Sequence, residues 1–288
     1  MASEKMLLYS FVGSQWAGVP HLGLAEKGFA KDEYDVKEIN LIAADNFEPK
    51  YIAVNPNGTI PSLAAPNLKV PLAESVEILD FLDEARPSAP KLKPNDLPTQ
   101  KKAQSIIDLV HSDRLSTDLI LLQAQDAEEM RTKQISMWYK FVVNRQHKLE
   151  HWHSKLPDHP FYGKKLEENS PLYELYTSGA VPLPNHDAFY EKTRDRYRGF
   201  AIAMSELDSS LVLPYATGDT VTTADLHVVP WLSHAMWGAG CTDIHDFIPL
   251  ENLIRKSAHG FEIGWRTKEW WSNMAERKSF QEVFRELH

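Results

Sequence analysis

The sequence holds a single cysteine, Cys241, among its 288 residues. One thiol cannot close a disulfide within the chain, which excludes a disulfide-stabilised fold and favours a reducing compartment. The chain also lacks an apolar run long enough to cross a membrane. Its start, MASEKMLLYSF, lacks the apolar length and the small-residue cleavage pattern of a secretory signal. We therefore expect a cytoplasmic protein without a membrane partner.

The sequence also has fewer basic residues, 31, than acidic ones, 40. The formal net charge is −9 and no long basic run occurs, which argues against a nucleic-acid partner. The chain has no phosphate-binding loop, no dinucleotide glycine pattern and no Ser-His-Asp order. His147 and His151 are four residues apart, as metal ligands on a helix often are, but the HExxH pattern is absent. We interpret these histidines as solvated and expect no metal.

Strand and helix patterns alternate in the first 86 residues. Gly28 is well suited to end a helix, and Pro87 stops the last helix of this part. The order β-α-β-α-β-β-α is predicted, with strands at 6–11, 34–39, 61–65 and 68–72 and helices at 17–27, 47–54 and 75–85. We expect residues 1–86 to form an α+β domain.

The rest of the chain has helical periodicity and no convincing strand. Residues 87–99 carry four prolines and are predicted to link two domains. Residues 100–288 are predicted to form an all-helical domain, with helices at 100–125, 128–152, 187–211, 223–237 and 270–287. The segment 153–185 is long for a connection in a compact domain, which indicates a functional or mobile segment.

Five segments in this order resemble glutathione S-transferases. LLYSF followed by SQWAGVPHLGLAEKGF is similar to the family's first strand, active-site loop and first helix. NPNGTIPSL is similar to its NPxGxVPxL motif, and LAESVEILDFL to its L-x-E-S motif; GDTVTTADL and WWSNMAERKSF resemble segments of its helical domain. The resemblance is weakest across 153–185, which has the character of an insertion. It implies a thioredoxin-like N-terminal domain, an enlarged all-helical C-terminal domain and a homodimer.

The resemblance implies a cis peptide bond between Ile60 and Pro61. The N–H and C=O of Ile60 would then be available to an extended peptide, which would pair with them as an added strand. The cysteinyl unit of glutathione is such a peptide. Because cis X–Pro bonds are a minority, about 5% of those in folded proteins, the alternative is a plain turn into an edge strand.

Three further residues are expected to bind glutathione by the same resemblance. Glu74 would bind the ammonium of the γ-glutamyl unit, and Ser75 would bind its carboxylate through the backbone N–H and the hydroxyl. The alternative for Ser75 is a helix cap. Relatives often carry a basic residue for the glycine carboxylate; here Asn46 takes that place, with Lys50 nearby on a helix.

Ser14 is the predicted catalytic residue, because it falls where related transferases carry a catalytic serine or cysteine. A hydroxyl that donates a hydrogen bond to sulfur favours the thiolate and lowers the pKa of the thiol. Tyr9 and Ser10, at the end of the first strand, are the alternatives. A serine cannot form a disulfide with glutathione, which argues against the reductase chemistry of cysteine-type relatives.

The second substrate is expected to be a small hydrophobic electrophile. Trp16, His111 and Arg114 are predicted to line its pocket, whereas Thr222 and Asp225 are interpreted as a structural capping box. The resemblance implies a transferase with glutathione as co-substrate, of the kind used in detoxification and secondary metabolism. The alternatives are a glutathione-dependent isomerase, an ether-cleaving enzyme, a dehalogenase, or a glutathione-binding protein without catalysis.

Overall fold

The computed structural model describes residues 5–178 and 186–288. Its N-terminal part contains the short 3₁₀ turns η1 (Gln15–Ala17) and η2 (Asp45–Phe47) in addition to its regular elements. Those elements, in chain order, are β1 (Met6–Ser10), α1 (Gly18–Glu26), β2 (Tyr34–Glu38), α2 (Pro49–Ile52), β3 (Ser62–Ala64) and α3 (Ser75–Ala85). This arrangement confirms the predicted thioredoxin-like domain.

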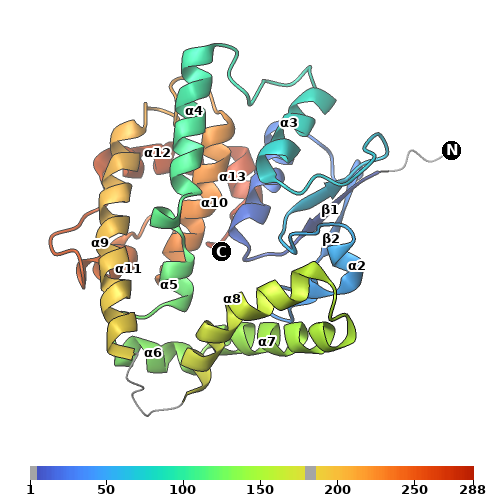
Figure 1. The fold of residues 1–288 in the computed structure, drawn as a ribbon. Coiled ribbons are helices and arrows are strands. Elements are labelled where there is room, and N and C mark those ends of the chain that lie inside the picture. The colour runs from blue at the N-terminus through green and yellow to red at the C-terminus, as the bar shows by residue number, and fades with distance from the viewer. Residues whose placement is uncertain (1–4, 179–185) are drawn as a thin grey trace.

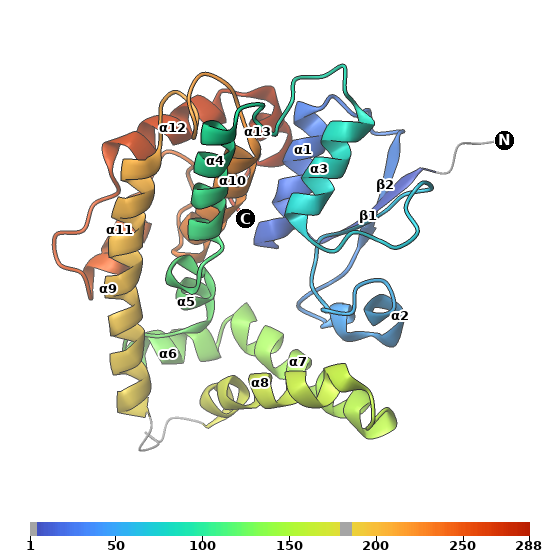
Figure 2. The same cartoon turned by 45° about the horizontal axis from the view of Figure 1, so that its top comes forward.

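The sheet has the strand order β2-β1-β3, with β1 parallel to β2 and antiparallel to β3. Successive side chains of β1 point to opposite faces, as in any strand. Leu8 packs with Leu24 of α1 and Leu82 of α3. Tyr9 belongs to a separate cluster with Tyr51 of α2. The central strand is therefore covered on both faces, by α1 and α3 on one side and by α2 on the other (Figure 2).

Two predictions in this part were wrong in detail. The strand expected at 68–72 is only an isolated bridge between Leu63 and Leu72. The helix expected at 47–54 is the short α2, because the extended Glu48 separates it from η2. Pro49, at the first helical position, has no N–H to contribute to a continuous helix.

Among its described residues, the C-terminal part contains helices and loops but no strand, and isolated β-bridges join Val212 to Thr217 and Tyr215 to Gly218. It also contains the turn η3 (Asp113–Leu115). The helices are α4 (Leu97–Val110), α5 (Asp118–Leu122), α6 (Ala127–Gln134), α7 (Met137–Lys155), α8 (Pro160–Thr177), α9 (His186–Ser210), α10 (Thr223–Gly238), α11 (Ile248–Arg255), α12 (Trp265–Ala275) and α13 (Lys278–Val283).

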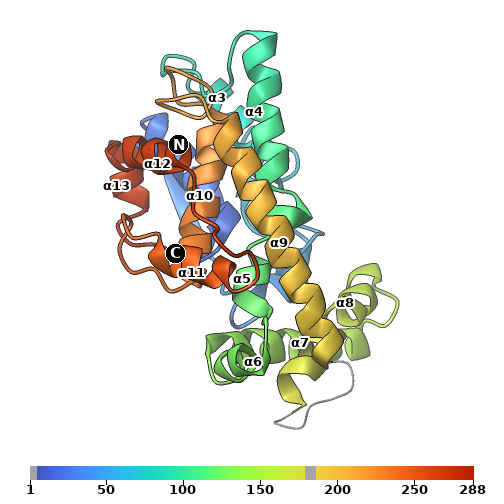
Figure 3. The ribbon, with the colours of Figure 1, turned by 90° about the vertical axis from the view of Figure 1, so that its left-hand side faces the viewer.

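Helix α10 lies at the centre of this part, beside α4 and α9 (Figures 1 and 3). Nearly all of its side chains are buried, as its apolar sequence predicts. The expected capping box is present. The Thr222 hydroxyl accepts from the backbone N–H of Asp225, and the Asp225 carboxylate accepts from the backbone N–H of Thr222. These two residues therefore have the structural role assigned to them.

Several helices are shorter than expected. The helix predicted at 100–125 is divided into α4, η3 and α5, and α4 begins within the predicted linker, where the Asp96 carboxylate accepts from the Thr99 N–H. The helix predicted at 128–152 is divided at Ser136, whose hydroxyl caps α7. The helix predicted at 270–287 is the end of α12 together with α13. At Asp96 and at Ser136, a local capping contact competes with apolar periodicity.

The segment 153–185 contains helix α8, which the sequence analysis did not predict. Helix α11 was not predicted either. Residues 179–185 of that segment lie outside the described residues. Helices α7 and α8 pack together as a hairpin that lies beneath both halves of the molecule, close to α2 (Figure 1). The domain boundaries at 86 and 99 stay a prediction.

Of the helices in the part of the chain that the structure describes, none has the length and apolarity needed to cross a membrane.

Candidate active site

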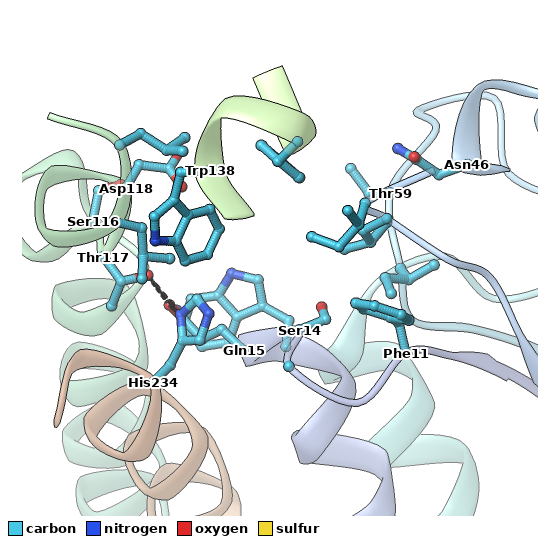
Figure 4. A pocket seen from close by; sticks show the side chains of 18 of the residues that line it. Phe11, Ser14, Gln15, Asn46, Thr59, Ser116, Thr117, Asp118, Trp138 and His234 are labelled. Carbon is cyan, nitrogen blue, oxygen red and sulfur yellow. Dashed lines mark hydrogen bonds between the residues drawn. The ribbon is translucent and has the colours of Figure 1, made fainter. Parts of the chain in front are cut away.

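A cleft of about 810 Å³ lies between the two halves of the molecule. The N-terminal half contributes the loop before α1, η2 and the turn before Pro61. The helical half contributes side chains from α5, α7, α8 and α10. Figure 4 shows Asn46 and Thr59 at one end, Asp118 and His234 at the other, and Ser14 between them.

Ser14 stands at the floor of this cleft. Its backbone N–H donates to the Phe11 carbonyl at 3.1 Å, and its carbonyl accepts from the Ala17 N–H at 3.1 Å. Its hydroxyl makes no capping bond, and it is directed into the open part of the cleft (Figure 4). The backbone is thus held by a tight turn while the hydroxyl stays available to a ligand.

The two alternatives to Ser14 do not line the cleft. The Tyr9 ring is 8% exposed and packs near Tyr51, with 5.7 Å between the ring centroids. The Ser10 hydroxyl lies 2.9 Å from Nε2 of His21 and is buried. The geometry favours Ser14 over both.

The Ile60–Pro61 peptide bond is cis, as expected. Ile60 lines the cleft, whereas Pro61 is buried behind it. The Thr59 carbonyl accepts from the Tyr51 hydroxyl at 2.6 Å and from the Asn55 amide at 2.7 Å, which anchors the turn. Among the backbone hydrogen bonds of the described residues, none uses the N–H or C=O of Ile60.

Asn46 lines the cleft, but the nitrogen of its amide already donates to the protein. Nδ2 donates to the Gly58 carbonyl at 2.7 Å in a buried contact. Oδ1 is buried and has no partner among the described residues. Asn46 therefore holds the turn at Gly58 in place and presents no cation to a carboxylate.

Glu74 and Ser75 lie at the start of α3 and are not among the lining residues of the cleft. The Ser75 hydroxyl is 3.2 Å from Nε2 of His227 on α10. Nδ1 of His227 lies 2.8 Å from the Thr223 carbonyl, so that nitrogen carries the proton and Nε2 accepts from Ser75. The Ser75 hydroxyl, which was expected to bind the ligand, thus bonds to the helical half of the protein. The group of Ser75 that is left to bind a carboxylate is its backbone N–H.

The structure brings Trp16 and His111 together at the cleft, but not Arg114. The Trp16 and His111 rings stack with 3.8 Å between their centroids. Burial lowers the pKa of His111 to about 4, so the ring is neutral at physiological pH. Arg114 does not line the cleft; its guanidinium binds both carboxylate oxygens of Glu206 at 2.7 Å.

A polar cluster at the far end was missed. Nδ1 of His234 lies 3.0 Å from the Thr117 hydroxyl and 3.2 Å from Oε1 of Gln15, and that hydroxyl also donates to Gln15 (Figure 4). Burial lowers the pKa of His234 to about 4. Because His227 and His234 are seven residues apart, they share a face of α10, and this spacing was the available signal.

Helix α7 contributes two further residues that were missed, Trp138 and Arg145. The guanidinium carbon of Arg145 lies 4.5 Å from the ring centroid of Phe47 and 4.9 Å from that of Phe141. Burial lowers the pKa of Arg145 to about 10, so it remains a cation. Within the described ranges, no group of three His, Cys, Asp or Glu side chains is arranged to hold a metal ion.

Comparison with known proteins identifies the N-terminal half. Residues 8–91 match the family model "Glutathione S-transferase, N-terminal domain". Glutathione S-transferase Z1 of Arabidopsis thaliana is 36% identical over 94 residues, which is 33% of this chain and 40% of that protein. Maleylacetoacetate isomerase of Mus musculus is 30% identical over 114 residues, 39% of this chain and 50% of that protein. The chain thus matches half or less of the length of these relatives.

Solved structures resemble the whole chain at low identity, which shows the fold alone. Maleylacetoacetate isomerase from Methylobacterium extorquens AM1, with bound malonate and glutathione, has a TM-score of 0.58 at 18% identity, over 96% of this chain and 95% of that one. The β-etherase LigF from Sphingobium sp. has a TM-score of 0.58 at 15% identity, over 98% and 99%. By sequence, residues 8–91 are thus a glutathione S-transferase N-terminal domain, and the chain as a whole shares the fold of these structures.

Proposed function

We propose that this protein is a glutathione transferase in which Ser14 stabilises the glutathione thiolate. The observation that carries the proposal is the Ser14 hydroxyl, directed into the cleft that Ile60 also lines. The cysteinyl unit of glutathione would pair with the backbone of Ile60 as an added strand. Its sulfur would then face Ser14.

The chemical step follows from the properties of a thiol. A free thiol has a pKa near 8.5 and is only a few per cent ionised at neutral pH. A hydroxyl that donates to the sulfur favours the anion. The thiol proton passes to solvent, the thiolate attacks an electrophilic carbon, a C–S bond forms, and the leaving group departs with its electron pair. The protein contributes thiolate stabilisation and proximity.

The second substrate is proposed to be a small hydrophobic molecule with an aromatic or unsaturated group. Trp16, Trp138 and Phe141 provide flat apolar walls to the cleft. The neutral His111 and His234 add hydrogen-bonding groups without adding charge.

Isomerisation is the second candidate, and the similarity of residues in the N-terminal half to a maleylacetoacetate isomerase favours it. The same thiolate would add to a conjugated double bond, allow rotation and leave, so glutathione is recovered. Ether cleavage and dehalogenation would instead consume it. Product analysis separates the reactions: a conjugate or a released leaving group indicates substitution, and an isomer with unchanged glutathione indicates isomerisation.

The test compares wild type with Ser14→Ala, using a chlorodinitrobenzene electrophile and the ultraviolet absorbance of the bound thiolate. We expect the pKa of bound glutathione to rise by about one to two units, which lowers kcat/KM at neutral pH by about 10- to 100-fold. Ser10→Ala is the matched control and is expected to keep the wild-type rate. Full activity in Ser14→Ala together with loss in Tyr9→Phe would reassign the role to Tyr9.

Retention on immobilised glutathione without turnover of any electrophile would favour a binding protein. We also propose a homodimer in the cytoplasm, which light scattering and cell fractionation test.

A further inference from the structure

One cation in the cleft has no use in the mechanism above. Among the hydrogen bonds and ion pairs between residues in 5–178 and 186–288, none involves the Arg145 guanidinium. Lys165, which also lines the cleft, is paired with Glu168 at 2.8 Å. Asp118 and Glu168 attract Arg145 electrostatically, but neither lies within 4.0 Å of it. Arg145 is therefore a desolvated cation whose donors are available to a ligand.

The packing of α7 determines which end of the cleft this cation serves. The neighbouring Asn144 donates its amide N–H to the Ile42 carbonyl at 2.8 Å, and Lys148, one turn further, binds the Glu48 carboxylate. Both contacts are with the segment that contains η2. The Phe47 ring lies under the guanidinium. Arg145 is thus held over Phe47, at the end of the cleft that Asn46 lines.

The residues of the N-terminal half that line this end of the cleft include no cation. A glutathione molecule that pairs with Ile60 and directs its γ-glutamyl end toward α3 would direct its glycyl end toward Asn46. The Asn46 amide donates to Gly58 instead. The N-terminal half would then give the glycyl carboxylate no charged partner, and burial of an anion without one is costly.

We propose that Arg145 binds the glycyl carboxylate of glutathione and determines the preference of this protein for the complete tripeptide. The inference rests on the proposed function. A guanidinium matches a carboxylate with two parallel N–H···O bonds, and the flanking Phe47 and Phe141 rings fix its plane in advance. The cation comes from the α7–α8 hairpin, so the helical half would take part in recognising the first substrate.

The test measures binding of three thiols to wild type, Arg145→Gln and Arg145→Lys, by isothermal titration calorimetry. The thiols are glutathione, γ-glutamylcysteine, which lacks the glycine, and glutathione esterified at the glycyl carboxylate. We expect wild type to bind glutathione about 10- to 100-fold more tightly than the other two, the range of a charge-assisted hydrogen-bonded pair. Arg145→Gln is expected to lose this preference by weakening only glutathione, and Arg145→Lys to keep part of it. Arg131→Gln, which removes an exposed arginine of α6, is the control.

Each result decides the inference. Equal binding of glutathione and its glycyl ester to wild type would overturn the inference. This comparison needs no variant, so it remains decisive even if Arg145→Gln does not fold. An unchanged preference in Arg145→Gln, with a raised KM only for a carboxylate-bearing electrophile, would assign Arg145 to the second substrate. If wild type binds none of the three thiols, the proposed function itself fails, and the inference fails with it. Binding without discrimination overturns the inference alone.

Discussion

Gly58 lies where the turn of the glutathione S-transferase N-terminal domain meets the α7–α8 hairpin. Its φ is +62°, a left-handed value that side-chain-bearing residues rarely adopt. A Cβ at this position would lie 2.6 Å from Cζ of Phe161 on α8. Its carbonyl accepts from Asn46. One glycine thus links the backbone conformation of the turn, the docking of the hairpin and the wall of the cleft.

We expect Gly58→Ala to lower the free energy of unfolding by about 1–3 kcal/mol, because backbone strain adds to the collision with Phe161. The KM for glutathione should also rise, since the turn beside Ile60 shifts. Urea denaturation and steady-state kinetics measure the two effects.

Gly28→Ala is the matched control. Gly28 has a similar φ of +68°, but a Cβ at this position would have no atom within 4 Å of it. The substitution should show the backbone cost alone, about 1 kcal/mol, with an unchanged KM. Adding Phe161→Leu to Gly58→Ala should recover part of the loss. Equal effects of the two glycine substitutions would show that contact with Phe161 is unimportant.

Helix α10 shows how one carboxylate can stabilise an apolar helix. The Asp225 side chain is fully buried and accepts four hydrogen bonds, from the N–H groups of Ala216 and Thr222, the Thr222 hydroxyl and Nε1 of Trp270. These contacts join the start of α10 to the preceding loop and to α12. All four partners are donors, so the site is matched to an acceptor with two oxygens.

We expect Asp225→Asn to lower the free energy of unfolding by about 3 kcal/mol or more, because an amide NH₂ would face a donor and the charge-assisted bonds would be lost. Trp270→Phe, which removes one donor, should cost less. Asp219→Asn changes an exposed aspartate of the same loop and should have little effect. Urea midpoints compare the three variants, and a cost for Asp225→Asn no greater than that for Asp219→Asn would contradict this role.

At the scale of the whole molecule, the two halves meet through buried polar contacts. The Glu26 carboxylate of α1 accepts from Arg277 at 2.7 Å and from Ser279. Ser75 donates to His227. Burial lowers the pKa of His227 to about 3 and that of His21 to about 4, and His111 and His234 are shifted in the same direction. The folded protein therefore keeps several histidines neutral at its centre.

These pKa shifts predict that the folded protein loses stability in acid. In the unfolded protein a histidine has a pKa near 6.5. In the folded protein these histidines bind a proton only near pH 4 or below. Between these values the unfolded state binds more protons, so the free energy of unfolding falls as pH decreases from about 6.5 to about 4. His227→Asn should reduce this slope, and His245→Asn, at an exposed position, should leave it unchanged. Urea midpoints from pH 7 to pH 4 test this, and a flat wild-type profile would contradict it.

The sequence by itself determined the features that depend on neighbouring residues. The order of strands and helices in the first domain and the capping box at Thr222 each rest on a few consecutive residues whose backbone chemistry admits few alternatives. The cis bond before Pro61 was implied by the family resemblance, because local chemistry alone favours the trans bond. The choice of Ser14 followed from the resemblance to related transferases, and the structure directs its hydroxyl into the cleft.

Only the tertiary structure decided which distant groups meet. Ser75 contacts His227 across 152 residues, and Arg114 contacts Glu206 across 92. These partners engage two side chains that the sequence analysis assigned to ligand binding. Arg145 reaches the cleft because α7 and α8 dock on η2. No local pattern encodes such pairings, because a side chain's partner depends on packing between elements, and the free energy of that packing is a property of the folded molecule.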